Sequence, residues 1–407
     1  MAQPLAGIRV LEFANFIAGP FCGMLLADMG ADVIKIEPPR GDLARAIPPI
    51  INGESAPFAA LNRNKRSLAL DLKTSEGRDI VFRLVKDADV FLENNRPGVM
   101  DRLGLDSVAI KECNPHIVYT SISGFGQTGP DRNRGGVNLI VEAMAGTLSV
   151  IGKPGEMPMR PGLQTADILG AMFAAYSTLA GLVGAARHGE GRISDVSLIE
   201  ASIAAAVWET AEYFATGEVP KQMGHSHRGS APYQLFATRD DRYLAIGAPS
   251  NEHFSRLMMV LGLDEYVDDV RFNTYASRKD NEDELVPLVA SGISKWDAVD
   301  FEAVMAKEGV PCGPVRTYEE ALADPHSRAR QLVVSVNHPL HGEMKTVRNP
   351  VVMDHDGPEI KCAAPLLGQH SVEILDLIGI DGGALDQLIK SGVTFVPALT
   401  QPSETAK

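Results

Sequence analysis

Short apolar runs alternate with helix-forming segments through the first third of the 407-residue chain. Each apolar run has the length of one strand. The runs are IRVLEFA (8–14), ADVIKIE (31–37), RSLALDL (66–72), ADVFLEN (88–94) and HIVYTSIS (116–123). A helical segment at 73–88 follows the third run, with Thr74 as its expected N-cap. This alternation predicts an α/β fold with a doubly wound, largely parallel sheet and helices on both faces.

The pattern changes after residue 190. A short strand and an Ala-rich helix are expected within 192–217, and a polar loop, EVPKQMGHSHRGSAP, follows at 218–232. A smaller α+β unit begins near its end, and the last eighty residues resemble a return to the first domain. We therefore predict a large domain at 1–200, a linker at 201–224, a small domain at 225–325 and a return to the large domain at 326–407.

The charge balance narrows the classes of partner. A formal net charge of −14 argues against nucleic acid and against anionic membrane surfaces, which are bound through Lys and Arg. The four cysteines lack metal or disulfide spacing, and no signal peptide is visible, so a cytoplasmic location is expected. One uncharged stretch, 168–186, approaches the length of a membrane span. Its Ala and Gly content and its central Tyr176, Ser177 and Thr178 favour a buried core helix.

The segment GFGQTG at 124–129 fits the dinucleotide pattern G-x-G-x-x-G. That motif requires a helix at its third glycine and normally follows the first strand. Here the next residues, PDRNRGG, are typical of a turn, and the strand is a late one. We therefore expect a glycine-rich active-site or nucleotide-contacting turn. The sequence also lacks H-E-x-x-H and G-x-S-x-G, so neither a metal site nor a serine hydrolase is predicted.

Asp167 lies where the apolar 168–186 segment begins. A carboxylate in a first helical turn is common, because the helix dipole favours it there. The alternative is a nucleophilic carboxylate, kept ionised by the helix terminus and shielded from water by apolar neighbours. The residues around Asp167 leave both interpretations open.

Several long stretches together resemble the class III CoA-transferases, the family of formyl-CoA:oxalate and carnitine CoA-transferases. The matching pieces are LAGIRVLEFANFIAGPFCGMLLADMGADVIKIEPPRGD, NRNKRSLALDLKTSEG, DVFLENNRPGVMDRLG, GFGQTGP, GRISDVSLIEA and GVPCGPVRTYEEALADPH. The resemblance implies a Rossmann-like large domain, a smaller domain and an interlocked, ring-like homodimer. It also implies that acyl-CoA and small carboxylic acids are substrates, with no permanently bound cofactor.

The resemblance assigns roles to individual residues. Asp167 falls on the catalytic aspartate, which is expected to form aspartyl anhydride and aspartyl-CoA thioester intermediates. The implied CoA contacts are Ile17, Ala18, Arg40, Leu70, Asp71, Leu72, Lys73, Asn94, Asn95, Arg96 and Arg102. The implied substrate contacts are Gly135, Gly136, Val137, Asn138, His227, Arg228 and Gly229.

Two alternatives to CoA transfer stay open. A 2-methylacyl-CoA racemase or epimerase of this fold needs a histidine where Val137 stands, and valine cannot carry a proton. A non-catalytic CoA-binding protein is the other alternative. The segment APYQLF is similar to the dicarboxylate-using branch, such as succinate–hydroxymethylglutarate CoA-transferase. Arg228 or His227 is therefore a candidate for holding a second carboxylate.

Overall fold

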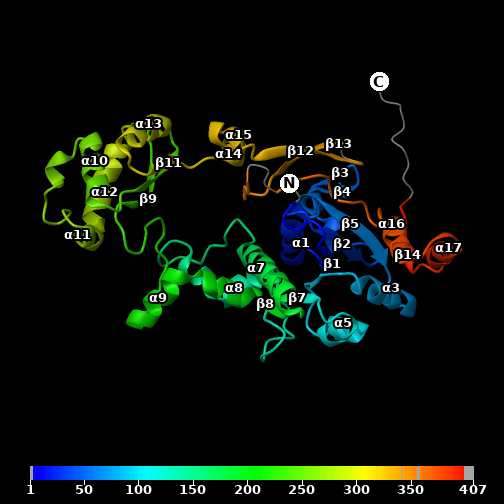
Figure 1. Cartoon of the computed structure of the whole chain (residues 1–407). Coiled ribbons are helices and arrows are strands. Elements are labelled where there is room, and N and C mark those ends of the chain that lie inside the picture. Colours follow the sequence, from blue (N-terminus) through cyan, green and yellow to red (C-terminus); the bar gives the residue numbers. More distant parts are fainter. Residues whose placement is uncertain (1–2, 341, 355–357, 398–407) are drawn as a thin grey trace, which may run out of the picture. The chain divides into compact units, whose positions relative to one another are not determined.

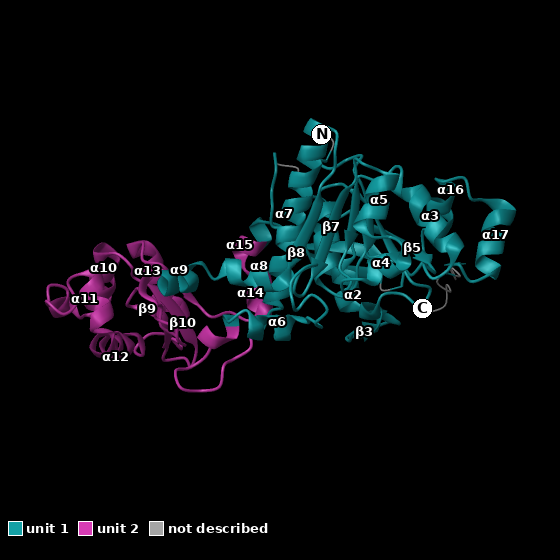
Figure 2. Ribbon diagram, turned by 90° about the horizontal axis from the view of Figure 1, so that it is seen from below, with its two compact units in different colours: residues 1–147, 161–214, 328–407 teal, residues 148–160, 215–327 magenta. Residues whose placement is uncertain are grey.

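The computed structural model describes residues 3–340, 342–354 and 358–397 (Figure 1). The chain forms two compact units, coloured separately in Figure 2. Unit 1 contains 1–147, 161–214 and 328–407, and unit 2 contains 148–160 and 215–327. Residues 148–160, expected in the large domain, thus belong to unit 2. The expected linker 201–224 is largely helical, because α8 (Leu198–Ala205) and α9 (Val207–Thr216) occupy most of it.

A seven-stranded sheet forms the centre of unit 1. Its strands are β1 (Arg9–Phe13), β2 (Asp32–Glu37), β5 (Lys65–Leu70), β6 (Val90–Glu93), β7 (Val118–Ser123), β8 (Ile193–Ser197) and β14 (Thr394–Phe395). The order is β14-β5-β2-β1-β6-β7-β8, and every pairing is parallel except β14 with β5. The predicted α/β fold with a largely parallel sheet is confirmed.

Strand alternation divides the core of unit 1 into two layers. Val10 and Leu11 of β1 point to opposite faces, and each joins a different apolar cluster. One face is covered by α3 (Ser75–Val85), α4 (Val99–Leu103), α5 (Ser107–Cys113) and α16 (Ser371–Asp376). The other is covered by α1 (Ala18–Asp28), α6 (Asn138–Met144), α7 (Thr165–His188) and α8. Helices on both faces exclude water from parallel strands, whose residues are apolar on both sides.

The remaining elements of unit 1 are short. They are η1 (Leu43–Ala46), α2 (Ala56–Leu61), α17 (Gly382–Lys390), the ribbon of β3 (Ile50–Ile51) with β4 (Glu54–Ser55), and the ribbon of β12 (Val333–His338) with β13 (Gly342–Val347). The short helices η2 (Thr147–Val150) and α15 (Pro325–Ala329) cross the boundaries between the units. Thr74 caps α3 as predicted, because its hydroxyl accepts the Gly77 N–H at 3.0 Å.

Helix α7 buries only one face in the described chain. That face consists of small residues, including Gly170, Ala174 and Gly181, whereas Tyr176 on another face is 70% exposed. The helix predicted to be buried in the core thus packs into the core of unit 1 with one face. Among the described helices, α7 alone is long and apolar enough to cross a membrane. That judgement rests on length and composition, and a single such helix is weak support for a span.

Unit 2 has a three-stranded antiparallel sheet with its own apolar core. The strands β9 (Tyr233–Ala237), β10 (Tyr243–Gly247) and β11 (Cys312–Pro314) are ordered β11-β10-β9. Its other elements are α10 (Asn251–Leu261), η3 (Asp264–Tyr266), α11 (Tyr275–Asp280), α12 (Glu282–Ile293), α13 (Ala298–Glu308) and α14 (Tyr318–Ala323). Unit 2 thus combines an antiparallel sheet with helices around one apolar core.

Candidate active site

The carboxyl edge of the parallel sheet collects most of the residues singled out in unit 1. The chain runs from β1 outward to β5 and then returns to β6 on the other side of β1. The sheet therefore changes direction between β1 and β6. In open α/β sheets, ligands bind outside the carboxyl ends of the strands at this switch point. The predicted CoA contacts lie at the end of β5 or after β1, β2, β5 and β6, all at this edge.

Two asparagines join the strands at the switch point. The Asn15 N–H donates to Asn94 Oδ1 at 2.8 Å, and Asn94 Nδ2 donates to the Asn15 carbonyl at 2.8 Å. Asn95 Nδ2 donates to the Phe13 carbonyl at 3.0 Å. These bonds satisfy backbone groups of the loop between β1 and α1. Asn94 and Asn95 therefore fix the loop that contains the predicted contacts Ile17 and Ala18.

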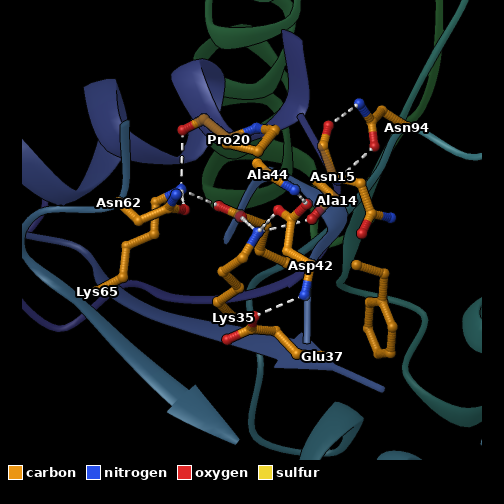
Figure 3. A network of polar contacts seen from close by, with 12 residues as sticks. Ala14, Asn15, Pro20, Lys35, Glu37, Asp42, Ala44, Asn62, Lys65 and Asn94 are labelled. Carbon is orange, nitrogen blue, oxygen red and sulfur yellow. Dashed lines mark hydrogen bonds and ion pairs between the residues drawn. The ribbon is translucent and has the colours of Figure 1, made fainter. Parts of the chain in front are cut away.

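Beneath this loop lies a network of buried charges that the sequence interpretation missed (Figure 3). Lys35 Nζ contacts Glu12 at 3.2 Å and Asp42 at 3.0 Å, and it donates to the Ala14 carbonyl at 2.7 Å. Lys65 Nζ contacts Glu12 at 2.7 Å. The side chains of all four charged residues are fully buried. Asp42 also accepts the Phe16 N–H at 3.3 Å, so the network holds the β1–α1 loop from below.

The network contains balanced charge, which is what makes its burial possible. Burial opposes a charged Lys35, but Glu12, Asp42 and Glu37 outweigh that effect and raise its pKa. Burial lowers the pKa of Lys65 to about 8, with Glu12 opposing the shift. The pKa of Glu37 is lowered, because hydrogen bonds and the charge of Arg45 overcome its burial.

A signal for this network was present in the sequence. Glu12 and Lys35 interrupt the apolar runs of the first two predicted strands. Both have the strand parity of Val10 and Val33, which face α1, and the register pairs Glu12 with Lys35. Charges on a buried face must be paired. That rule would have predicted the ion pair once the register was known.

The glycines of GFGQTG and of the following GG pair allow two backbone segments to touch. A Cβ on Gly124 would lie 2.8 Å from the Gly136 Cα, and one on Gly136 would lie 2.7 Å from the Gly124 Cα. No helix starts at Gly129; residues 130–134 form turns and a bend, and α6 begins at Asn138. The motif is therefore a glycine-rich turn, and the requirement of a dinucleotide fingerprint is not met.

Helix α7 runs antiparallel to β7 and so brings Asp167 to the same edge. The Thr178 and Thr120 hydroxyl oxygens are 2.7 Å apart, and Gly181 packs on Val118, which lies nearer the start of β7. Asp167 precedes Thr178 by eleven residues, or about 16 Å along the helix. It therefore lies beyond the carboxyl end of β7. Its N–H donates to Asn138 Oδ1 at 3.2 Å, which links it to the glycine-rich segment.

The Asp167 carboxyl group is half-buried and its pKa is raised to about 6, by burial and then by the charge of Glu142. The helix terminus alone does not set its ionisation, contrary to the simplest expectation. At pH 7 a group with this pKa is still about nine-tenths ionised. Asp167 thus combines a desolvated position with a mostly available carboxylate, as a nucleophile requires.

The basic residues assigned to CoA lie exposed along the carboxyl edge. Arg40 follows β2, Lys73 follows β5, and Arg96 and Arg102 follow β6. An Arg96 nitrogen lies 2.9 Å from the Cβ that a side chain at Gly135 would have, so the guanidinium packs on the Gly135 backbone. Exposed cations near the ends of parallel strands suit the phosphates of a nucleotide.

The second predicted substrate segment belongs to unit 2. His227, Arg228 and Gly229 lie before β9, where the Gly229 N–H donates to His227 Nδ1 at 3.1 Å and Arg228 donates to the Lys221 carbonyl at 2.9 Å. A cavity of about 400 Å³ lies beside this loop. It is lined by His225, Ser226, His227, residues of β9 and β10, and 311–313. The cavity has the size of a small-ligand site.

Possible metal ligands do not gather in one place in the part of the chain that the structure describes. No group of three or more His, Cys, Asp or Glu side chains there has the geometry to hold a metal ion. All four cysteines are free thiols. The Asp167 carboxyl, the Asn138 amide and the basic edge residues are the candidate groups of unit 1.

Comparison with known proteins gives consistent matches over nearly the whole chain. The model of CoA-transferase family III matches residues 5–371. The chain is 38% identical over 381 residues to a succinyl-CoA–D-citramalate CoA-transferase of Chloroflexus aurantiacus, covering 93% of this chain and 95% of the relative. It is 36% identical over 380 residues to a succinate–glutarate CoA-transferase of Agrobacterium fabrum, covering 91% and 95%. A CAIB/BAIF family protein from Brucella suis superposes with a TM-score of 0.83 at 34% identity, covering 93% and 100%.

Proposed function

The chain belongs to CoA-transferase family III, and from this premise we propose that it moves CoA from succinyl-CoA to a small dicarboxylate through a covalent intermediate on Asp167. Enzymes of this family transfer CoA between an acyl-CoA and a carboxylic acid without a permanently bound cofactor. Two relatives are named for D-citramalate and for glutarate, and these names support a dicarboxylate acceptor.

The observation that carries the proposal is the position of Asp167. Asp167 lies in the first turn of α7, and its carboxylate is half-buried and largely ionised. This turn lies at the edge of the sheet where the strands that precede the predicted CoA contacts end. Burial matters because an acyl-carboxylate anhydride is hydrolysed when water reaches it. Asn15, Asn94 and the buried Lys35 network support the loop on which Ile17 and Ala18 would contact CoA.

In the first half of the proposed reaction, one Asp167 oxygen attacks the thioester carbonyl of the donor. The carbon–sulfur bond breaks, CoA leaves as thiolate, and a mixed anhydride joins the acyl group to Asp167. The thiolate then attacks the Asp167 carbonyl carbon. The donor acid leaves as its carboxylate, and an aspartyl-CoA thioester remains.

The second half repeats these steps in reverse with the acceptor. The acceptor carboxylate attacks the aspartyl thioester and releases the thiolate, giving a new anhydride. The thiolate attacks the acceptor carbonyl, which forms the new acyl-CoA and restores the Asp167 carboxylate. No electrons are gained or lost, and overall one thioester and one carboxylate are exchanged for another thioester and another carboxylate. Backbone N–H groups around Gly135 and Gly136 are candidates for stabilising the oxyanions, each such donor being worth roughly 3 kcal/mol of barrier.

Within unit 2, His227 and Arg228 are candidates for binding a carboxylate group of a dicarboxylate. Arginine offers a planar fork that matches a carboxylate. The cavity beside this loop supports a small acid as ligand. In the same proposal, the chain forms the interlocked dimer implied by its family resemblance. Support comes from α9, which buries none of its residues in the single chain although it contains Phe214, which is 81% exposed.

The location within the cell also stays a proposal. Free thiols at Cys22, Cys113, Cys312 and Cys362 agree with a reducing, cytoplasmic environment. A racemase remains the second enzyme class, and Val137 argues against it, because it offers no group that can carry a proton.

Asp167→Asn tests the proposed function. The amide preserves the shape of the side chain and is a far weaker nucleophile, so transfer should fall at least about 10⁴-fold. Binding of CoA should persist. Wild-type protein quenched after mixing with succinyl-CoA should carry an adduct on the peptide with Asp167, detected by mass spectrometry. An Asp167→Asn variant that turns over at the wild-type rate, or wild-type peptide that never carries an adduct, contradicts the proposal.

A further inference from the structure

The first turn of α7 is held by side chains of α6. The N-cap of α7, Gln164, makes no side-chain capping bond. Instead Asn138 Oδ1 accepts the Asp167 N–H at 3.2 Å. Glu142 Oε1 accepts the Thr165 N–H at 3.2 Å and also the Thr165 hydroxyl. The first N–H groups of a helix have no partner within it, so α6 supplies what α7 lacks.

Glu142 is a costly residue to place here. It is fully buried, and within the part of the chain that the structure describes its Oε2 has no hydrogen-bond partner. An apolar residue would avoid a buried oxygen without a partner, which typically costs about 1–3 kcal/mol. Glu142 lies beside the first turn of α7, so its charge can act on Asp167 in that turn.

Charge on Glu142 acts on Asp167. Burial is the larger cause of the raised pKa of Asp167, and Glu142 is the charged neighbour that adds to it. Other elements packed on α7 and α6 also contain titratable groups. These are Cys22 and Asp28 on α1, Tyr119 on β7, Asp195 on β8 and Glu200 on α8. Glu142 alone among these groups contributes to the shift in Asp167 and is hydrogen-bonded to the same helical turn.

We propose that Glu142 is a positioning residue for Asp167: it anchors the start of α7 through Thr165, and its negative charge makes the nearby carboxylate a stronger nucleophile. The inference rests on the proposed function of Asp167. A nearby negative charge destabilises an ionised carboxylate and makes it more basic. A more basic carboxylate attacks a thioester carbonyl more readily. Because Glu142 contacts Thr165, it acts through the nucleophile's surroundings and does not itself react.

Glu142→Gln separates the charge from the anchor. The amide oxygen still accepts from Thr165, while the negative charge is lost. Transfer requires ionised Asp167, so the wild-type rate of adduct formation should fall below about pH 6. Without the Glu142 charge the pKa of Asp167 drops, so this acid limb should move to lower pH by roughly 0.5–1 unit. Above pH 7 the rate should fall roughly three-fold.

Two controls identify the source of the limb. Glu93, a buried carboxyl group at the end of β6, also has a raised pKa, of about 7, chiefly because of burial. Glu93→Gln should leave the limb where it is if the limb belongs to Asp167. Thr165→Val keeps the Glu142 carboxyl group and removes the hydroxyl that donates to it, so the limb should move if this contact sets the charge beside Asp167. This variant also provides the test if the Glu142→Gln variant does not fold.

The outcomes are separable. A folded Glu142→Gln variant with an unmoved acid limb overturns the role of Glu142, as does a Thr165→Val limb that stays in place. Either result leaves the nucleophile intact if Asp167→Asn is still inactive. If Asp167→Asn is fully active, the proposed function fails whatever Glu142 does.

Discussion

Lys35→Met should destabilise unit 1 far more than an ordinary lysine substitution. Methionine matches the length and apolar stem of lysine but removes the ammonium group. Glu12 and Asp42 then lose a partner at 3.2 and 3.0 Å, and the Ala14 carbonyl loses its donor at 2.7 Å. Since these side chains are fully buried, water cannot replace the lost contacts.

The expected cost follows from that geometry. Removing one partner of a buried ion pair typically destabilises a protein by about 3–5 kcal/mol, because it leaves an uncompensated charge. The raised pKa of Lys35 also means that its protonated form stabilises the folded state. This stabilisation is complete at neutral pH and is lost only as the pH rises through the folded-state pKa. The loss should also loosen the β1–α1 loop, since Asp42 holds the Phe16 N–H, and so weaken CoA binding.

Hydrogen–deuterium exchange on peptides covering β1 and β2 measures the effect within unit 1. If these amides exchange through unfolding of the unit, a loss of about 3 kcal/mol speeds exchange by roughly 100-fold. Lys86→Met is the matched control, because Lys86 is exposed at the end of α3 in the same unit and should change stability by less than about 0.5 kcal/mol. Equal exchange in the two variants would refute the reasoning that the Lys35 network stabilises the fold.

Two further predictions concern the glycine-rich turn and the assembly. Gly136→Ala places a Cβ 2.7 Å from the Gly124 Cα, where neither backbone can yield, so it should lower stability by roughly 1–3 kcal/mol and slow adduct formation. Gly162→Ala is the control, because a Cβ there meets open space and should change neither quantity. Equal melting temperatures for the two variants would contradict this account. Light scattering should give twice the chain mass of 43.7 kDa at micromolar concentration, and a monomer mass would count against the proposed interlocked dimer.

The strands and helices were predictable where periodicity is strong. The five apolar runs coincide with β1, β2, β5, β6 and β7 to within about two residues, and Thr74 is the N-cap of α3. Predictions that depended on long-range contacts were less accurate. The single helix expected within 192–217 is interrupted at Ala206. The edge strand β14 was missed, because two residues do not form a pattern until β5 is beside them.

The candidate site divides in the same way. Asp167 could be chosen from the sequence because it begins a conspicuous apolar helix and matches a family motif. The role of Glu142 could not be chosen, because its contact with Thr165 spans 23 residues and depends on how α6 packs on α7. Likewise, Lys35 and Glu12 are 23 residues apart and meet only through strand register.

What the amino-acid sequence determined by itself is therefore local: alternating apolar runs set the α/β class and glycines mark the turns. The resemblance to a family made Asp167 the candidate nucleophile. Only the tertiary structure decided which charges share a buried face and which helix caps another. The physical reason is that hydrophobic period and capping act between neighbours in the chain, whereas pairing of buried charges depends on distance in space and on the exclusion of water.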